Sequence, residues 1–330
     1  MSIKDSDRYN LKMKMLYYLY RKNYTQVEVA KMLNISRVTL RRLLDEAIDE
    51  GMVKIEITDV RNTLQRLQIE DELRQQYCLS NVILSENSCD SQEEINQLIA
   101  SEAASYFDKS IRSNMKIGIT WGRTLSAMVD RLSLNRSIQN LTVYTLLGNT
   151  TDSPEFQPNI LAQKLLQKYS GSLRTIAAPF MCGSAQLCAD MKKETQVASI
   201  LSEVRNLDMT IVGIGEAPTS GSDRLSDYPF DSATIDELVR CGAVGDICGN
   251  FFDICGRVCD TSIKSRIVSI DIAELPQHNL VVGVGGGPKK IKSILGALNG
   301  SYLDVLITDL ETAKQVLSLS TECRTQKIIC

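Results

Sequence analysis

Residues 25–44, TQVEVAKMLNISRVTLRRLL, decide the fold of the N-terminal part of the chain, because their spacing is that of a helix-turn-helix. The first helix has an apolar face formed by Val29, Ala30 and Leu33. The small side chain of Ala30 lets a second helix approach closely. Asn34 ends the first helix, since asparagine is one of the few non-glycine residues that accept a left-handed cap. Ile35 fills the corner, and Ser36 can cap the N-terminus of the second helix.

The second helix has two contrasting faces. Its predicted buried stripe consists of residues at helical spacing, namely Leu40, Leu43, Leu44, Ala47 and Ile48. Its opposite face is basic and can enter the major groove of a DNA duplex. We therefore predict DNA contacts from Thr25, Gln26, Ser36, Arg37, Val38, Thr39, Arg41 and Arg42. The alternative is an ordinary helical hairpin in a bundle, with its arginines on a solvated face.

The composition of the 330 residues is that of a soluble globular protein, with 43% hydrophobic and 23% charged residues. No apolar run approaches the roughly 20 residues of a membrane span, and the N-terminus lacks a signal-peptide pattern, so we expect a cytoplasmic protein. The ten cysteines include no C-x-x-C pair, and His278 is the one histidine, so the spacing of a zinc site is absent. We expect reduced thiols, no metal and no cofactor.

Residues 1–60 are predicted to form the DNA-binding domain. A helix over 8–22 precedes the motif, and Gly51 is placed to end its second helix. The alternation in MVKIEI, residues 52–57, then predicts a strand. This domain carries 11 Lys and Arg against 9 Asp and Glu, whereas the rest of the chain carries 26 against 31. Because the domain is only weakly basic, we expect two copies to share one duplex.

A connector over residues 61–80 follows, and its helix over 62–77 is either a solvated linker or a dimer-forming helix. Between residues 81 and 320, short apolar strands alternate with helices, which predicts an α/β domain with a parallel sheet covered on both faces. The predicted helices span residues 91–108, 123–133, 158–169, 193–206, 233–240, 288–298 and 309–318. Ligands are expected at the carboxyl ends of the strands. The tail, 321–330, matches no predicted element.

Two strand-to-helix loops have the composition of an anion site. In KIGITWGRT, residues 116–124, the backbone N–H groups at the helix start suit a phosphate, together with Thr120, Arg123 and Thr124. The alternative is a tight turn in which Trp121 simply packs. VGVGGGPKK, residues 282–290, repeats the arrangement with two lysines, Lys289 and Lys290. It fits neither familiar nucleotide motif, which leaves a smaller phosphorylated ligand open.

Two further segments follow predicted strands. IVGIGEAP, residues 211–218, is a third strand-to-loop transition at Gly213 and Gly215. GAVGDICGNFFD, residues 242–253, is predicted to be a loop that carries Asp246. A carboxylate in such a loop can accept sugar hydroxyls, although an aspartate that caps a turn is the commoner outcome.

Several of these stretches together resemble the SorC/DeoR family of bacterial sugar-responsive transcription regulators. The matching stretches are TQVEVAKMLNISRVTLRRLL, GMVKIEI, GITWGRT, VGIG, GAVGDICGNFFD and KKIKSILGALNGSYLDVLITDLETA. The helix-turn-helix is shared by many families, whereas TWGRT, GDICGNFFD and ILGAL with LITDLETA are specific in combination. The similarity is strongest to the sorbitol and sorbose type of regulator. One departure is Arg41, which stands where the recognition helix of the family usually has serine.

The resemblance implies a C-terminal domain related in fold to sugar-phosphate isomerases and glucosamine-phosphate deaminases, used as a sensor and not as an enzyme. It also implies a homotetramer that binds operator DNA and a phosphorylated sugar or polyol. The matching positions for the phosphate loop are Thr120, Trp121, Gly122, Arg123 and Thr124. Asp246 matches an acidic position that faces the sugar, and Lys290 a basic position near the phosphate. Gly148, Asn149 and Gly213 complete the predicted effector site.

Two other functional hypotheses remain open at this point. The first is an active sugar-phosphate isomerase or deaminase with an attached DNA-binding domain, which would need a general base at the sugar carbons. Asp246 could serve, but the sequence offers no second acid–base group with a clear spacing. The second is a constitutive architectural DNA-binding protein, which would leave the two anion loops without a role.

Overall fold

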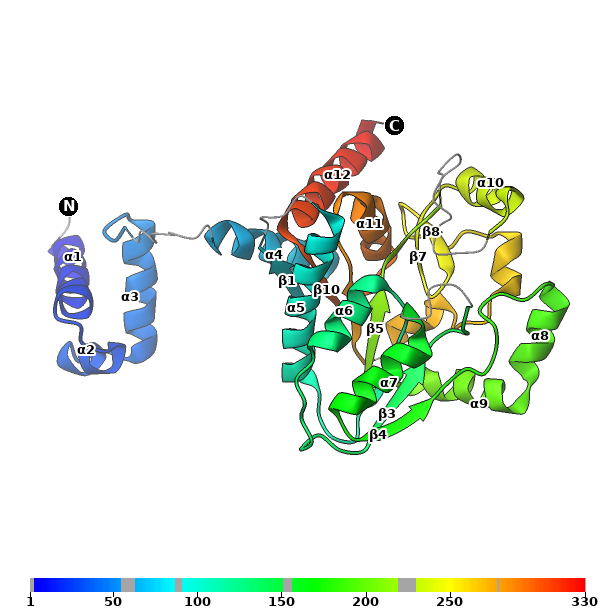
Figure 1. The fold of residues 1–330 in the computed structure, drawn as a ribbon. Coiled ribbons are helices and arrows are strands. Elements are labelled where there is room, and N and C mark those ends of the chain that lie inside the picture. Colours follow the sequence, from blue (N-terminus) through cyan, green and yellow to red (C-terminus); the bar gives the residue numbers. More distant parts are fainter. Residues whose placement is uncertain are drawn as a thin grey trace. The chain divides into compact units, whose positions relative to one another are not determined.

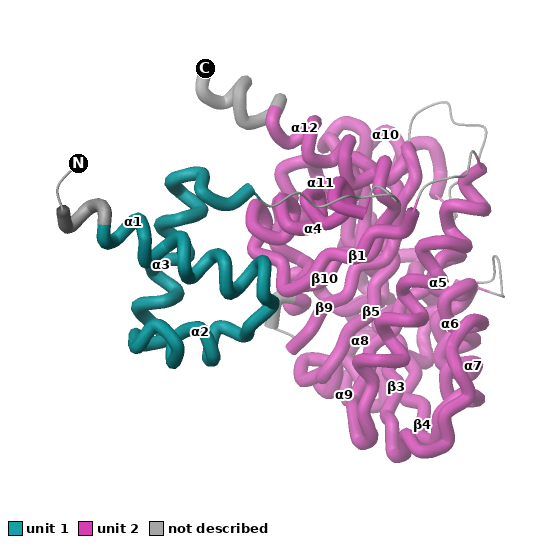
Figure 2. The backbone as a smooth tube through the Cα atoms, turned by 90° about the vertical axis from the view of Figure 1, so that its left-hand side faces the viewer, with its two compact units in different colours: residues 1–61 teal, residues 62–330 magenta. Residues whose placement is uncertain are grey.

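The computed structural model of the chain describes residues 3–54, 63–86, 91–150, 156–218, 230–277 and 279–329. The chain divides into two compact units, residues 1–61 and residues 62–330 (Figure 2). The predicted strand over 52–57 lies partly outside the described residues. Its described part, Met52 to Lys54, is not a strand.

The N-terminal unit is helical in its described part. Its elements are α1 (Ile3–Leu16), the π-helical turn η1 (Tyr17–Arg21), α2 (Gln26–Met32) and α3 (Arg37–Asp49) (Figure 1). The three α-helices share one core, which includes Met15, Val29, Ala30, Leu40, Leu43, Leu44 and Ala47. The predicted helix-turn-helix core is thus confirmed apart from Ile48, which is 39% exposed. Eight residues advance a helix about 80° beyond two full turns, so Ile48 lies beside the buried stripe begun by Leu40.

The predicted caps of this unit are present. Asn34 has a φ of 50° and Gly51 a φ of 70°, so each occupies the left-handed region that ends a helix. Ser36 is the N-cap of α3, and its hydroxyl accepts the backbone N–H of Thr39 at 3.0 Å. The helix predicted over residues 8–22 begins earlier, at Ile3, and widens into the π-helical turn at Tyr17.

The second unit is built on a sheet of seven parallel strands in the order β1-β10-β9-β5-β2-β3-β4. Their bounds are β1 (Asn81–Ser85), β2 (Lys116–Ile119), β3 (Leu141–Thr145), β4 (Gly171–Arg174), β5 (Met209–Gly213), β9 (Val281–Val284) and β10 (Val305–Asp309). The first strand pairs with the last, since Ile83 stands opposite Ile307. The predicted α/β class with a parallel sheet is confirmed.

Helices cover both faces of this sheet, and each face has its own apolar core. On β10, Val305 and Ile307 belong to one core and Leu306 to the other, as the alternation of a strand requires. The core that contains Val305 and Ile307 is covered by α5 (Gln92–Ser110), α6 (Arg123–Arg131) and α7 (Pro158–Lys168). The core that contains Leu306 is covered by α4 (Thr63–Tyr77), α11 (Ile291–Asn299) and α12 (Leu310–Ile329) (Figure 1).

Three expectations from the sequence are corrected by the structure. The helix predicted near 193–206 is present as α9 (Thr195–Glu203) and the 3₁₀ turn η3 (Val204–Asn206), but an unpredicted helix, α8 (Ala185–Lys193), precedes it with Ser184 as its N-cap. The tail continues α12 as far as residue 329. The segment predicted to be a loop around Asp246 is a β-hairpin, formed by β7 (Ala243–Ile247) and β8 (Asn250–Asp253).

The hairpin joins β6 (Gly215–Glu216) in a small antiparallel sheet, and α10 (Ser232–Arg240) precedes it in the chain. Both residues of its turn are left-handed, with φ of 56° at Cys248 and 74° at Gly249. These are the dihedral signs of a type I′ hairpin turn, in which asparagine or aspartate is the usual first residue. Because cysteine occupies that position, the sequence pattern does not indicate the hairpin.

No helix among the described residues is long and apolar enough to cross a membrane. The described residues also contain no group of three or more His, Cys, Asp or Glu side chains that could hold a metal ion.

Candidate functional site

The basic face of α3 is exposed, as a DNA-binding helix-turn-helix requires. Val38 is 80% exposed, and the side chains of Arg41 and Arg42 are 69% and 67% exposed. Arg37 opens the helix directly after the Ser36 cap. The hydroxyl of Thr39 lies 2.9 Å from that of Ser36, so these two predicted DNA-binding residues also organise the helix start.

The other predicted DNA contacts lie at the start of α2. Thr25 is its N-cap and forms a capping box with Glu28: the Glu28 N–H donates to the Thr25 hydroxyl at 3.3 Å, and the Thr25 N–H donates to the Glu28 carboxylate at 2.8 Å. Gln26 is exposed beside it. The N-termini of α2 and α3 are therefore both fixed by side-chain caps.

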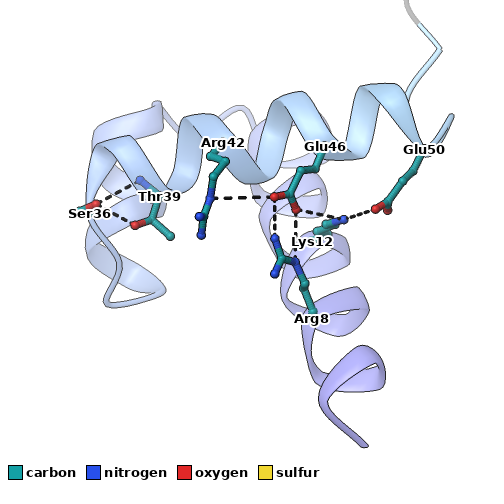
Figure 3. A network of polar contacts seen from close by, with 7 residues as sticks. All are labelled: Arg8, Lys12, Ser36, Thr39, Arg42, Glu46 and Glu50. Carbon is teal, nitrogen blue, oxygen red and sulfur yellow. Dashed lines mark hydrogen bonds and ion pairs between the residues drawn. The ribbon is translucent and has the colours of Figure 1, made fainter. Parts of the chain in front are cut away.

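A carboxylate-centred ion-pair network fixes α1 against α3 (Figure 3). Glu46 accepts from Arg8 at 2.5 and 3.2 Å, and the ammonium of Lys12 lies 3.3 Å away. Lys12 is only 3% exposed and also donates to Glu50 at 2.5 Å. The hydrogen bond from Arg8 lowers the pKa of Glu46, and the bond to Glu50 raises the pKa of Lys12, so both stay charged. Arg42 approaches the same carboxylate at 3.9 Å.

In the second unit, two loops that carry predicted effector residues lie where the strand order of the parallel sheet reverses. The next strand of this sheet after β2 is β3, and the next one after β5 is β9, on the opposite side, although β2 and β5 are neighbours. Ligands of open α/β sheets bind outside the carboxyl ends of such strand pairs. The two loops meet here, because the N–H of Gly213 donates to the hydroxyl of Thr120 at 3.0 Å. Thr120 is 1% exposed, so its hydroxyl holds the loop after β5 from inside the protein.

The start of α6 has the features of an anion site. Its N-cap is Gly122, with φ of 137°, and no side chain caps its first turn. The leading N–H groups of a helix lack intrahelical partners and carry the positive end of its dipole. Arg123, which is exposed, lies with its guanidinium 5.8 Å from the ring centroid of Phe156. Trp121 packs on Phe180 at 4.5 Å between ring centroids, so the packing alternative for Trp121 is present in the structure.

The glycine-rich loop after β9 is held by residues that the sequence analysis did not single out. The carboxylate of Asp309, 2% exposed, accepts the Gly287 N–H at 2.8 Å and the N–H and hydroxyl of Thr312 at 2.9 and 2.6 Å. From α5, the Gln92 amide donates to the Gly286 carbonyl at 3.0 Å. A Cβ on Gly286 would lie 2.3 Å from that Asp309 carboxylate, which explains why the loop contains glycine there.

These contacts connect the loop after β9 to the start of α6. The Gln92 amide also donates to Asn96 at 3.0 Å, and the Thr124 hydroxyl lies 3.3 Å from the same Asn96 oxygen. Lys290 is half-buried and is the last residue of a short 3₁₀ turn, η6 (Pro288–Lys290). The helix predicted to start at residue 288 thus begins with this turn, and α11 starts after Lys290.

Asp246 lies in β7 opposite Gly215 of β6 and is 2% exposed. One carboxylate oxygen accepts the N–H of Gly249 across the hairpin turn at 3.0 Å. The other is so close to Gly215 that a Cβ there would lie 1.7 Å from it. The turn-capping alternative for this aspartate is therefore present in the structure. The pKa of the neighbouring Cys248 thiol is raised, mainly by burial and secondly by the negative charge of Asp246.

Gly148 and Asn149 follow β3, at the position of the predicted glycine-rich ligand turn. Both residues are bonded to neighbouring backbone, since their N–H groups donate to the carbonyls of Val268 and Ala178 at 2.9 and 3.0 Å. Those N–H groups are therefore not available to an anion. The Asn149 side-chain oxygen is buried, and no group in the described part of the chain donates to it.

Comparison with known proteins agrees with this architecture. Residues 61–318 match the model of the Sugar-bind family, described as a sugar-binding domain. The chain is 27% identical to the sorbitol operon regulator of Klebsiella pneumoniae, over 96% of this chain and all of that one. The full-length crystal structure of that regulator superposes with a TM-score of 0.72, over 94% of this chain and 99% of that one.

A second relative is the deoxyribonucleoside regulator of Bacillus subtilis, 24% identical over 95% of this chain and 99% of that one. A third is the transcriptional regulator LsrR of Escherichia coli, 26% identical over 91% of this chain and 92% of that one. Because the family model covers most of the chain, the protein belongs to the Sugar-bind family and, with these relatives, to the SorC/DeoR group of sugar-responsive transcriptional regulators.

Proposed function

We propose that the protein is a sequence-specific DNA-binding regulator of a sugar or polyol utilisation operon, switched by a phosphorylated sugar or polyol. The observation that carries this proposal is the start of α6, an uncapped helix N-terminus with Arg123 and Thr124, in a chain that also has an exposed basic recognition helix. The names of the relatives, a sorbitol operon regulator and a deoxyribonucleoside regulator, support it.

In this proposal the effector phosphate lies at the N-terminus of α6, with Arg123 and Lys290 as its cationic partners. A phosphate requires such local cations because the residues after the first 60 carry a net negative charge. Thr120, Trp121, Gly122, Thr124 and Gly213 shape the loop around it. Asn149 and Asp246 supply acceptors for hydroxyls, since the buried Asn149 oxygen has no donor among the described residues.

The proposed assembly is a cytoplasmic homotetramer that presents DNA-binding units in pairs. Effector binding changes operator affinity by favouring one arrangement of the assembly over another. An isomerase or deaminase activity is the competing function, and a turnover assay with the same compounds detects it.

The proposal is tested with a panel of sugar phosphates and polyol phosphates. Duplexes enriched by the protein from a randomised pool serve as operator, and each compound is scored by gel shift, calorimetric titration and turnover. We expect one compound to change operator affinity without being consumed, and Arg123→Ala and Lys290→Ala to lose that response while still binding the duplex. Each substitution removes a charge-assisted bond and should reduce effector affinity by roughly 1.5–3 kcal/mol. Unchanged effector affinity in both variants would contradict the phosphate site, and turnover lost in Asp246→Ala would favour the enzyme.

A further inference from the structure

Arg41 and Asp45 form an ion pair on the exposed face of α3, one helical turn apart. The Arg41 Nε lies 3.2 Å from one Asp45 carboxylate oxygen and 3.3 Å from the other. Both side chains are exposed, 69% for Arg41 and 54% for Asp45. Exposed pairs of this spacing contribute little to stability, so this pair can hold a side chain in place and still open easily.

The geometry of the pair leaves a particular part of Arg41 available. Asp45 engages Nε, and within the described residues no hydrogen bond involves the two terminal amino groups of the guanidinium. Those two groups form the fork that contacts O6 and N7 of guanine in the major groove. Asp45 therefore favours one orientation of the long Arg41 side chain and leaves its base-reading fork without a hydrogen bond among the described residues.

The charge of Asp45 has a second effect. On a duplex without the right bases, an arginine gains affinity mainly from phosphates, and that contact is independent of sequence. A carboxylate next to Arg41 both competes with phosphate for the guanidinium and repels the duplex. It thus weakens phosphate-only binding, while orienting Arg41 favours the complex in which the bases are read.

The neighbouring arginines are placed differently. Glu46 lies 3.9 Å from Arg42, but its carboxylate is already bonded to Arg8 and Lys12 (Figure 3), so it connects α1 to α3. Within the described part of the chain, Arg37 makes no ion pair. Asp45 is thus the acidic residue of α3 whose side chain pairs with Arg41 alone among the described residues.

We propose that Asp45 is a positioning residue that sets the sequence specificity of DNA binding, by orienting Arg41 and by opposing its contact with phosphate. This inference rests on the proposed DNA-binding function. Arg41 stands where the recognition helix of the family usually has serine. The Arg41–Asp45 pair would therefore give this chain its own way of reading an operator.

The test uses the full chain and two duplexes of equal composition: one that the wild-type protein enriches from a randomised pool, and a shuffled version of it. We expect Asp45→Asn to bind the shuffled duplex about two-fold more tightly, the scale of an exposed ion pair, and the enriched duplex about two-fold more weakly. The preference for the enriched duplex then falls about four-fold. The salt dependence of binding to the shuffled duplex should become steeper. In wild type, Asp45 takes up a cation when Arg41 leaves it for a phosphate, which offsets part of the counterion release from the DNA, and asparagine takes up none.

The control is Asp49→Asn, which removes the same charge from an exposed position of α3 about 12 Å along the axis from Arg41. It should change both affinities in the same direction and leave their ratio as in wild type. Asp45→Glu keeps a carboxylate at this position and should restore the preference. In an Arg41→Ala background, Asp45→Asn should have no effect on the ratio.

The outcomes separate the inference from the function on which it rests. If the wild-type protein enriches no duplex, the proposed DNA-binding function fails and this inference fails with it. If a duplex is enriched but Asp45→Asn strengthens binding to both duplexes equally, or leaves their ratio unchanged, Asp45 contributes only bulk charge and the inference alone is wrong.

Discussion

Arg37 and Arg42 lie on the same exposed face of α3 but have different surroundings, since Arg42 approaches the shared Glu46 carboxylate and Arg37 opens the helix beside the Ser36 cap. We expect Arg37→Ala and Arg42→Ala to weaken operator binding and to leave effector binding intact. A lost guanine contact should reduce affinity by roughly 1–3 kcal/mol, whereas a lost phosphate contact should mainly flatten the salt dependence. Gel shifts at several salt concentrations measure both. Unchanged affinity and salt slope in both variants would place the DNA-binding surface elsewhere.

Asp246 and Gly215 offer a second test at the scale of residues. Asp246→Ala removes a proposed hydroxyl acceptor, so it should weaken binding of the effector more than binding of inorganic phosphate, which offers no sugar hydroxyls. Gly215→Ala should have the same selective effect, because the added Cβ would lie 1.7 Å from the carboxylate and must displace it. Calorimetric titration with both ligands measures the difference. Equal losses for the effector and for phosphate would show that Asp246 acts on the fold and not on the sugar.

Single residues could be predicted where local backbone rules decide their role. Asn34, Ser36 and Gly51 were recognisable as caps because their side chains, or the lack of one, suit a specific helix position. Glu46 and Asp309 were not, because their partners, Arg8 and Gly287, are distant in sequence and adjacent only in the fold. No local pattern indicates such a pairing.

At the scale of elements, the loop after β9 depends on Asp309 at the end of β10. Asp309→Ala would leave the buried N–H and hydroxyl of Thr312 without their acceptor, which costs roughly 1–3 kcal/mol for each group left unpaired, and the Gly287 N–H would retain only the Thr312 hydroxyl, at 2.8 Å. We expect a lower midpoint of thermal unfolding and weaker effector binding, since the same loop carries Lys290. Calorimetry measures both quantities on one sample. A destabilised variant with wild-type effector affinity would contradict the role of this loop in the site.

The attachment of α9 to the sheet should depend on pH. Glu203 accepts from Arg174 at 2.6 Å, from Ser199 at 2.9 Å and from the buried Tyr144 at 3.1 Å. These bonds, that of Arg174 first, lower its pKa from 4.5 to about 2. A carboxyl whose pKa is lower in the folded state contributes stability above its unfolded pKa and loses it as the pH falls through the folded pKa.

The expected result is a free energy of unfolding that decreases between pH 4.5 and about 2 by more in wild type than in Glu203→Gln. Urea denaturation across this range measures the difference. A stability gap between the two proteins that is constant with pH would mean that the Glu203 bonds do not favour its charged form.

The parallel sheet could be predicted because buried strands alternate with amphipathic helices, and that pattern leaves few alternatives. The hairpin could not, since its turn has cysteine where asparagine or aspartate usually signals a left-handed residue. The helix α8 was not predicted, and no proline or glycine stands at Glu194, the residue that separates α8 from the predicted α9. The tail continues α12, whose apolar face is fixed upstream by Ala313 and Val316.

At the scale of the whole molecule, a weakly basic DNA-binding unit implies assembly. We expect at least a dimer in solution, and a tetramer under the proposed function, because a single unit offers too little contact for a specific site. Light scattering measures the assembly, and footprinting measures the number of half-sites protected. A monomer that still protects one half-site at the same concentration would contradict this expectation.

The pairing of β1 with β10 has a consequence for protein synthesis. During translation the helix-turn-helix emerges from the ribosome first, whereas β1 remains without its neighbour until Val305–Asp309 has been made. Until then the loop after β9 lacks Asp309 and Thr312, and β9 lacks its neighbour β10. Nascent or truncated chains would therefore have the N-terminal unit without a complete sheet in the second unit. Because a single DNA-binding unit offers too little contact for a specific site, such chains would neither respond to an effector nor hold an operator until the last strand of the sheet is in place.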